Sequence, residues 1–196
     1  RFSTNLMRNM VKIFSYLEIP QVKFLTIQNE NLNNENVKQN LSREIIEKLK
    51  FPIFVKPSNS GSSLGISKVI EKSEIFQALE KASEIDSRLV VEEGLEVREL
   101  ECGVIGNSHL YISEIGEVVY TSDWYNFESK YSKNNKIIIP AEVNAEITNQ
   151  IKKLAIRSCR ALNIYSFARV DFFLEKSSNK VFLNEINTIP GFTKNS

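Results

Sequence analysis

The chain has 196 residues, 42% hydrophobic and 25% charged, and its 25 Lys and Arg against 24 Asp and Glu leave a net charge of +1. This composition is typical of a globular protein with a sizeable core, and the near-neutral charge argues against a nucleic-acid-binding module, which needs clustered cations. Two cysteines are too few for a disulfide framework, and no apolar run reaches the roughly 18 residues of a membrane span, so we expect a cytoplasmic protein that binds neither nucleic acid nor membrane.

The N-terminal part of the chain predicts a helix, a strand and a loop. Residues 7–19 predict a short helix, and residues 21–27 predict a strand after Pro20. Residues 29–40 are polar and rich in asparagine, with a single apolar position in each half. This composition predicts a surface loop, most simply an insertion.

From residue 41 onward, helical and strand patterns alternate. Apolar residues recur with the period of a helix in residues 71–85, and the longest helical pattern covers residues 144–163. The remaining predicted elements are a helix over 42–50, strands over 51–56, 66–70, 88–93, 97–106 and 111–120, and a terminal hairpin over 167–192. This order predicts two α+β lobes, with helices packed on mainly antiparallel sheets.

The terminal hairpin carries the most informative polar residues. Side chains alternate between the faces of a strand, so Arg169 and Asp171 share one face, and Leu183, Glu185 and Asn187 share one face of the partner strand. A tight central turn places Asp171 opposite Glu185 and Arg169 opposite Asn187. Two carboxylates and an amide at cross-strand distance suit Mg²⁺ or Mn²⁺, bound together with substrate phosphates. The alternative is an ordinary charged face of an edge hairpin.

A loop rich in glycine and serine follows the strand that ends at Lys56, within the sequence VKPSNSGSSLG (residues 55–65). Glycine lets backbone amides approach a phosphate, and a neighbouring lysine supplies a point charge. The spacing matches neither a Walker A loop nor a dinucleotide-binding turn. A plain hairpin connection is the alternative to a nucleotide-binding loop.

Two further segments admit both a functional and a structural interpretation. The acidic segment VVEEGLEVRELE (residues 90–101) could bind adenine and ribose in a nucleotide enzyme, or could be a charged sheet edge. The segment WYNFESKYS (residues 124–132) places Lys130 and Tyr131 in an aromatic loop, which could equally be a surface turn.

In this order, the motifs KPSNSGSSLGISKV, VVEEGLEVRELECGVIGN, WYNFESKYS and RVDFF…NEINTIPGFT resemble the D-alanine–D-alanine ligases of the ATP-grasp superfamily. The resemblance implies an α+β ATP-grasp fold, in which two lobes clasp the nucleotide. The implied parts are the end of the linker region (1–28), a variable loop (29–40), the small lobe (41–95) and a truncated large lobe (96–196). The family's N-terminal substrate domain is expected to be absent from these residues.

The resemblance also implies roles for individual residues. Lys56 and Lys130 match lysines that contact the ATP phosphates, and Glu99 matches the ribose-binding glutamate. Arg169 matches the arginine that stabilises the transition-state oxyanion. Glu92, Glu93 and Leu95 match residues that bind adenine, and Asp171, Glu185 and Asn187 match the magnesium ligands. Ser62 and Tyr131 match two catalytic residues that are joined by hydrogen bonds. Ser63, Gly191 and Ser196 match positions that contact the substrate or the phosphorylated intermediate, and Ser63 is assigned to the ATP site as well.

The implied reaction is the ATP-dependent ligation of two D-alanines through an acyl phosphate, for peptidoglycan precursors in the bacterial cytoplasm. The implied full-length protein is a homodimer. A tyrosine at position 131 accompanies D-alanine as second substrate in this family, whereas phenylalanine accompanies D-lactate. The alternatives are a related ligase that makes D-Ala-D-lactate or D-Ala-D-Ser, and a fragment that binds ATP without turnover.

Overall fold

The structure is a computed structural model that describes residues 6–28, 34–58, 64–120 and 136–191, with side chains described from residue 10 onward. The chain forms two compact units. The first is built mainly from Val22–Leu95, and the second from Met10–Gln21 together with the chain from Glu96 onward. The N-terminal helix α1 (Leu6–Tyr16) therefore contributes residues from Met10 onward to the second unit.

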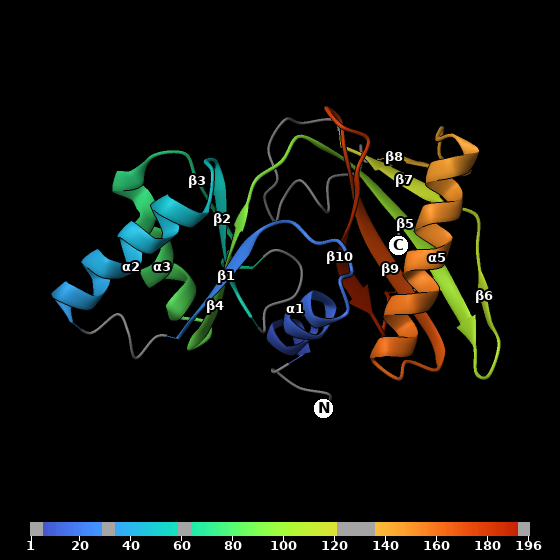
Figure 1. The fold of residues 1–196 in the computed structure, drawn as a ribbon, viewed down its shortest axis with the longest axis horizontal. Helices are drawn as coiled ribbons and strands as arrows, with labels where there is room; N and C mark the ends of the chain where they lie inside the picture. Colours follow the sequence, from blue (N-terminus) through green and yellow to red (C-terminus); the bar gives the residue numbers. More distant parts are fainter. Residues whose placement is uncertain (1–5, 29–33, 59–63, 121–135, 192–196) are drawn as a thin grey trace. The chain divides into compact units, whose positions relative to one another are not determined.

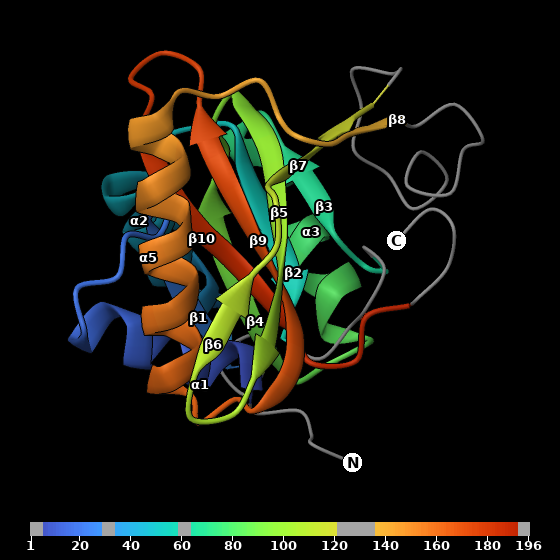
Figure 2. The same cartoon turned by 90° about the vertical axis from the view of Figure 1, so that its right-hand side faces the viewer.

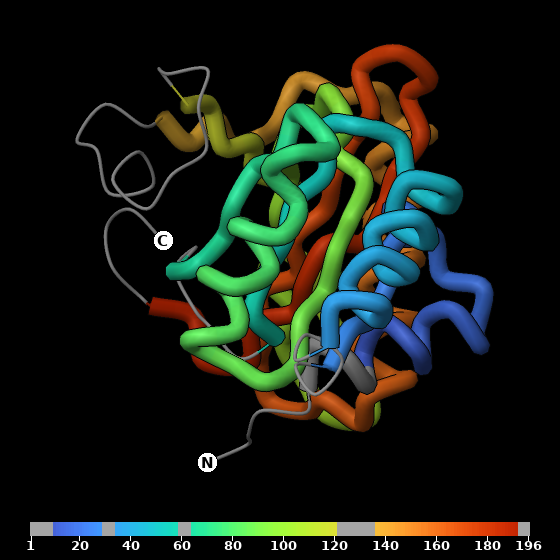
Figure 3. The backbone as a smooth tube through the Cα atoms, turned by 90° about the vertical axis from the view of Figure 1, so that its left-hand side faces the viewer, coloured from blue at the N-terminus to red at the C-terminus, as the bar shows by residue number. Residues whose placement is uncertain are grey.

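The first unit is a four-stranded antiparallel sheet with two helices on one face (Figures 1 and 3). The strand order is β1-β4-β2-β3. Ile45 of α2 and Leu79 of α3 bury completely against Ile53 and Val55 of β2. The elements are β1 (Phe24–Gln28), α2 (Glu35–Lys48), β2 (Ile53–Pro57), β3 (Ser67–Val69), the short 3₁₀ helix η2 (Lys72–Glu74), α3 (Ile75–Ser83) and β4 (Arg88–Glu93).

Helix α2 begins within the segment for which the sequence predicted a loop, residues 29–40. Asn34 is the N-cap, and its side-chain oxygen accepts a hydrogen bond from the backbone N–H of Asn36 at 2.9 Å. Asparagine is among the best N-cap residues, so the asparagines of this segment start a helix that Ile45 anchors in the core. The prediction of a loop over residues 35–40 is therefore wrong.

The apolar period predicted for residues 71–85 is confirmed in α3, where Ala78, Leu79 and Ala82 are buried. Ile85, the last apolar residue of the helical period predicted over 71–85, lies beyond the end of the helix and is 42% exposed, so the prediction is wrong at this position. It packs instead on Gly65, where φ is +75° and an added Cβ would lie 2.2 Å from Ile85 Cδ1. Both constraints require glycine at position 65.

The second unit is a six-stranded antiparallel sheet of order β10-β9-β5-β7-β8, with β6 paired to β5. The sequence did not predict β8, because this short strand is exposed at each residue and has no alternating pattern. The elements are β5 (Val97–Gly106), β6 (Leu110–Ile112), β7 (Gly116–Val119), β8 (Lys136–Ile138), α5 (Ala145–Ala161), β9 (Ser166–Glu175) and β10 (Val181–Asn187).

Helix α5 covers one face of this sheet, as Figure 2 shows. Asn144 caps it by accepting a hydrogen bond from the backbone N–H of Ile147 at 2.8 Å. Ile151 and Ala155 of α5 are completely buried in the same core as Phe14 of α1. The face of the sheet opposite α5 carries polar side chains, and we call it the open face of the second unit.

In the described ranges, none of the helices has both the length and the apolar character that crossing a membrane requires.

The two cysteines are buried free thiols of the second unit. Burial raises the pKa of Cys102 from 9.0 to about 12, with help from nearby negative charge, and raises the pKa of Cys159 to about 11. The thiolate is the reactive form, so both should be inert at about pH 8 in the native protein. We expect an aromatic disulfide reagent to label neither thiol before unfolding and both after it, and rapid labelling of native protein at either position would contradict this.

Candidate active site

The open face of the six-stranded sheet carries the polar residues of the hairpin. On β9, Val170 and Phe172 are buried in the core that includes α5, so the alternate residues Arg169 and Asp171 point to the opposite face. The side chains of Arg169 and Asp171 are 26% and 16% exposed. They are therefore accessible to a ligand but substantially removed from water.

The register of β9 and β10 places the polar residues in two facing pairs. Asp171 lies opposite Glu185, and Arg169 lies opposite Asn187. The predicted cross-strand pairing of these four residues is confirmed. Antiparallel pairing alone thus brings two carboxylates, an amide and a guanidinium to one part of the sheet.

Nearer the turn, the register differs from the prediction by one residue. An irregularity lies between Leu183 and Glu185, and beyond it Leu183 pairs with Phe172 and Val181 with Leu174. An extra residue in one strand changes the alternation of the faces on either side of it. Leu183 is therefore 3% exposed in the core, and its predicted place on the face of Glu185 is wrong.

Hydrogen bonds join the four polar side chains. Nε and Nη2 of Arg169 donate to the two carboxylate oxygens of Asp171, each at 2.7 Å. Nδ2 of Asn187 donates to Asp171 Oδ2 at 3.1 Å and to Glu185 Oε1 at 3.2 Å. The amide thus bridges the two carboxylates, and the guanidinium neutralises one of them.

The electrostatics of the cluster favour additional positive charge. Burial raises the pKa of Asp171 to about 7, the hydrogen bonds and charge of Arg169 oppose this rise, and the carboxylates of Glu185 and Glu101 add to it. The hydrogen bonds to Asp171 raise the pKa of Arg169, so its guanidinium stays charged. One guanidinium therefore faces several carboxylates in a partly desolvated site.

Glu101 is a member of this cluster that the sequence analysis did not identify. It lies on β5 directly opposite Asp171, and its Oε2 lies 3.3 Å from Nε of Arg169. The available signal was its spacing from Glu99, because residues two apart on a strand share a face. The segment 90–101 was interpreted either as a nucleotide-binding segment or as a charged sheet edge, and the neighbour of Glu101 comes from the long-range pairing of β5 with β9.

The donor set fits a hard divalent cation. Asp171 and Glu185 provide carboxylate oxygens, and rotation of the Asn187 amide would add a third oxygen donor to the pair that it now bridges. Within the described ranges, no group of three or more His, Cys, Asp or Glu side chains is arranged to hold a metal. A cation at this site would therefore depend on the amide, and on ligands that a substrate contributes.

In the first unit, Lys56 forms an ion pair with Glu92. Lys56 lies on β2, where Val55 and Pro57 are buried, so its side chain points away from that core. The lysine and glutamate side chains are 17% and 12% exposed. Glu92 of β4 thus holds the ammonium group in a defined position on this face of the sheet.

The other predicted nucleotide-binding residues have separate structural contacts. Glu93 Oε1 accepts a hydrogen bond from the backbone N–H of Lys50 at 2.9 Å, and Leu95 is half-buried at the end of the first unit. Glu99 belongs to the second unit, where its Oε2 accepts a hydrogen bond from Tyr120 at 2.9 Å.

Several predicted site residues lie at or beyond the limits of the described ranges. Gly191 is the last residue of the final range and is exposed. The residues outside the described ranges are Ser62, Ser63, Lys130, Tyr131 and Ser196.

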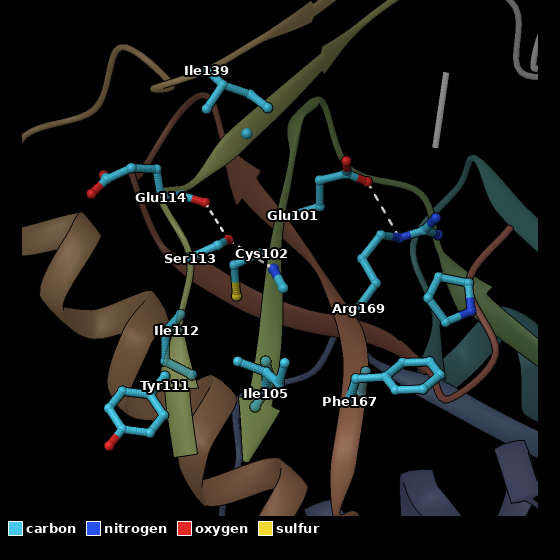
Figure 4. Close-up of a pocket in the computed structure, with 15 residues that line it drawn as sticks. Glu101, Cys102, Ile105, Tyr111, Ile112, Ser113, Glu114, Ile139, Phe167 and Arg169 are labelled. Carbon is cyan, nitrogen blue, oxygen red and sulfur yellow. Dashed lines mark hydrogen bonds and ion pairs between the residues drawn. The ribbon is translucent and has the colours of Figure 1, made fainter. Parts of the chain in front are cut away.

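A pocket of about 490 Å³ adjoins the polar cluster on the open face of the second unit. Figure 4 shows Glu101 and Arg169 at one side of it, with Ser113 and Phe167 among the other lining residues. A charged edge beside a largely apolar lining suits a small ligand with both polar and apolar groups.

Known proteins resemble this chain over nearly its whole length. The family described as D-ala D-ala ligase C-terminus matches residues 13–196. The D-alanine–D-alanine ligase of Prochlorococcus marinus subsp. pastoris (strain MED4) is 71% identical over 187 residues, a match that covers 95% of this chain and 53% of that protein. The chain thus spans about half the length of the curated relatives that it matches.

Solved structures of ligases in this family also match the fold of this chain. The VanG D-Ala:D-Ser ligase from Enterococcus faecalis matches with a TM-score of 0.81 and 34% identity, covering 95% of this chain and 53% of that chain. The D-alanyl-alanine synthetase A from Vibrio cholerae matches with a TM-score of 0.81 and 29% identity, covering 96% of this chain and 56% of that chain. The chain shares the ATP-grasp fold of these proteins, and it belongs to the D-alanine–D-alanine ligase family, in the region that forms the C-terminus of those enzymes.

Proposed function

We propose that the full-length protein joins two D-alanine molecules in an ATP-dependent reaction that supplies a peptidoglycan precursor. Family membership supports this proposal. The observation that carries it is the facing arrangement of Asp171 with Glu185 and of Arg169 with Asn187 on the open face of the sheet. This arrangement combines oxygen donors for a cation with a charged donor for a developing anion.

The proposed reaction has two steps. A carboxylate oxygen of the first D-alanine attacks the γ-phosphorus of ATP, which gives an acyl phosphate and ADP. The amine of the second D-alanine then attacks the acyl carbon, and inorganic phosphate and a proton leave as the peptide bond forms. Phosphoryl transfer depends mainly on positioning and on neutralising charge, and acyl transfer depends on stabilising the oxyanion.

The residues have complementary roles in this proposal. Lys56 supplies a point charge to the ATP phosphates, and Arg169 donates to the oxyanion. Asp171, Glu185 and Asn187 would hold Mg²⁺ or Mn²⁺. Such a cation neutralises charge on the transferred phosphoryl group. The proposal assigns the remaining ATP contacts to Lys130, Ser63, Glu99 and the segment Glu92–Leu95.

The proposal also assigns substrate contacts and a cellular setting. Ser62 and Tyr131 would orient the reacting groups, and Gly191 and Ser196 would contact the substrate or its phosphorylated intermediate. We infer a cytoplasmic location, since ATP is a cytoplasmic substrate, and we propose a homodimer from the resemblance to the family. Light scattering on the full-length protein measures the oligomeric state directly.

The nearest second candidate is a D-Ala–D-Ser ligase, because one of the matching solved structures has that activity. A lysine followed by a tyrosine at positions 130 and 131 favours D-alanine as second substrate over D-lactate. The remaining alternative is that residues 1–196 bind ATP but do not complete the reaction.

The test is to supply ATP, Mg²⁺ and D-alanine to the full-length protein, alone or with D-serine or D-lactate. We expect phosphate release only with D-alanine, and D-alanyl-D-alanine as the main product in each mixture by mass spectrometry. A predominance of D-Ala-D-Ser or D-Ala-D-lactate would identify the alternative ligase. Phosphate release that is independent of D-alanine would overturn the proposal.

A further inference from the structure

Arg169 is shared between carboxylates on two different strands. Its Nε and Nη2 donate to Asp171 on the same strand, and Nε also lies 3.3 Å from Oε2 of Glu101 on β5. Figure 4 shows Glu101 and Arg169 pointing toward one another. The side chain of Glu101 is 17% exposed, so water screens this ion pair less than it screens a surface pair.

Asp171 has two roles in the proposed site that conflict. Its carboxylate holds the Arg169 guanidinium through two hydrogen bonds, and it is also one of the proposed ligands of a divalent cation. A carboxylate that binds a dication attracts a guanidinium less strongly, because the dication repels the second positive charge. Arg169 therefore needs a second anchor if it is to keep its position when the cation site is filled.

We propose that Glu101 is that anchor, a positioning residue that holds Arg169 on the open face when Asp171 binds a cation. The proposal rests on the proposed function for the role of Arg169 in the reaction. Glu101 lies opposite Asp171, while Gly103, opposite Arg169, has no side chain that could accept a hydrogen bond. At this point of β5, Glu101 is therefore the side chain that can hold the guanidinium.

The contacts favour this role over that of an additional metal ligand. Within the described part of the chain, no three acidic side chains are arranged so that they could hold one metal ion. The amide of Asn187 bridges Asp171 and Glu185, whereas the contact of Glu101 is with the guanidinium. Nη1 of Arg169 has no partner among the described residues, and it remains available to a substrate while Nε is held.

Three variants of the full-length protein distinguish the contact of Glu101 with Arg169 from the effect of the Glu101 charge alone. Glu101→Gln keeps the shape and removes the charge, and Glu101→Asp keeps the charge but shortens the side chain, so that it no longer reaches Nε. Glu146→Gln is the matched control, because it removes an equal charge from an exposed position of the same unit, on α5 and away from the pocket. We expect both Glu101 variants to lower kcat by about ten- to a hundredfold with KM for ATP within about twofold, and the control to change neither.

The direct readout is the ¹⁵N–¹H resonance of Arg169 Nε, recorded with a non-hydrolysable ATP analogue that supplies the phosphate ligands, without D-alanine, and assigned by its loss in Arg169→Lys. In the wild type we expect the resonance to shift when Mg²⁺ is added and to remain protected from exchange. In Glu101→Gln and Glu101→Asp, we expect protection without Mg²⁺ and its loss when Mg²⁺ is present. A merely structural role for Glu101 would not make this loss depend on Mg²⁺.

Two results would overturn the inference. One is wild-type protection of Arg169 Nε in Glu101→Gln with Mg²⁺ present. The other is full recovery of kcat and protection in Glu101→Asp, which would show that nearby charge suffices without contact. Because the resonance requires no turnover, a protein that makes no dipeptide but loses protection in the Glu101 variants would overturn the proposed function and support the positioning role.

Discussion

Replacing Asp171 by asparagine is expected to lower the ligation rate of the full-length protein by about a thousandfold or more. The substitution keeps the shape of the side chain but removes the charge that binds Arg169 through two hydrogen bonds of 2.7 Å. It also removes one of the two carboxylates proposed to hold a cation. The orientation of Arg169 and the affinity for the cation should therefore both decline, which steady-state phosphate release and Mn²⁺ titration measure separately.

Glu175→Gln is the matched control for this variant. Glu175 lies on the same strand, at its far end, and accepts a hydrogen bond from Ser178 beside the turn. We expect its activity to stay within about twofold of the wild type, as is usual for a surface substitution away from the site. The site assignment would be wrong if Asp171→Asn, folded by circular dichroism, kept a tenth or more of the wild-type rate.

Replacing Lys56 by methionine is expected to lower kcat/KM for ATP by about a hundredfold. Methionine keeps most of the length of the side chain but removes the ammonium charge proposed to contact the phosphates. The change also leaves the Glu92 carboxylate, 12% exposed, without the ion pair that it has in the structure. Steady-state kinetics with varied ATP, together with thermal unfolding, separates the loss of binding from a loss of stability.

The double variant Lys56→Met/Glu92→Gln makes this separation sharper. It removes the unpaired charge, so the melting temperature should recover relative to Lys56→Met while kcat/KM for ATP stays low. Because Glu92 is itself assigned to the ATP site, the single variant Glu92→Gln measures its own share of the loss in kcat/KM. Lys48→Met is the control, because Lys48 is 57% exposed and forms a surface pair with Glu44 on the same helix. If Lys56→Met retained the wild-type kinetics for ATP, Lys56 would have only a structural role.

Most of the residues and pairings of the polar cluster could be predicted from the local sequence pattern. Strand parity placed Arg169 and Asp171 on one face, and the assumption of a tight turn gave their pairing with Asn187 and Glu185. These inferences succeed because side chains alternate with a period of two and because an antiparallel hairpin has a short-range register. The helical period likewise identified the buried face of α5 around Ile151.

Three predictions from the sequence were wrong because the local pattern of apolar and polar residues did not show where an element begins, ends or changes register. The irregularity between Leu183 and Glu185 moved Leu183 into the core, although the alternation predicted it on the polar face. Ile85 lies beyond the end of α3, where the helical period no longer applies. The polar, asparagine-rich sequence of residues 29–40 predicted a loop, although Asn34 caps a helix there and Ile45 anchors that helix in the core.

By itself, the sequence determined that the chain is built from α+β elements with antiparallel pairing, and which hairpin residues form the polar cluster. It did so because periodicity and turn length are local properties. Only the tertiary structure decided that β5 lies beside β9, which places Glu101 opposite Asp171 and next to the Arg169 guanidinium. That neighbour comes from a pairing between strands far apart in the chain, where register depends on the packing of the whole unit and leaves no short-range trace in the sequence.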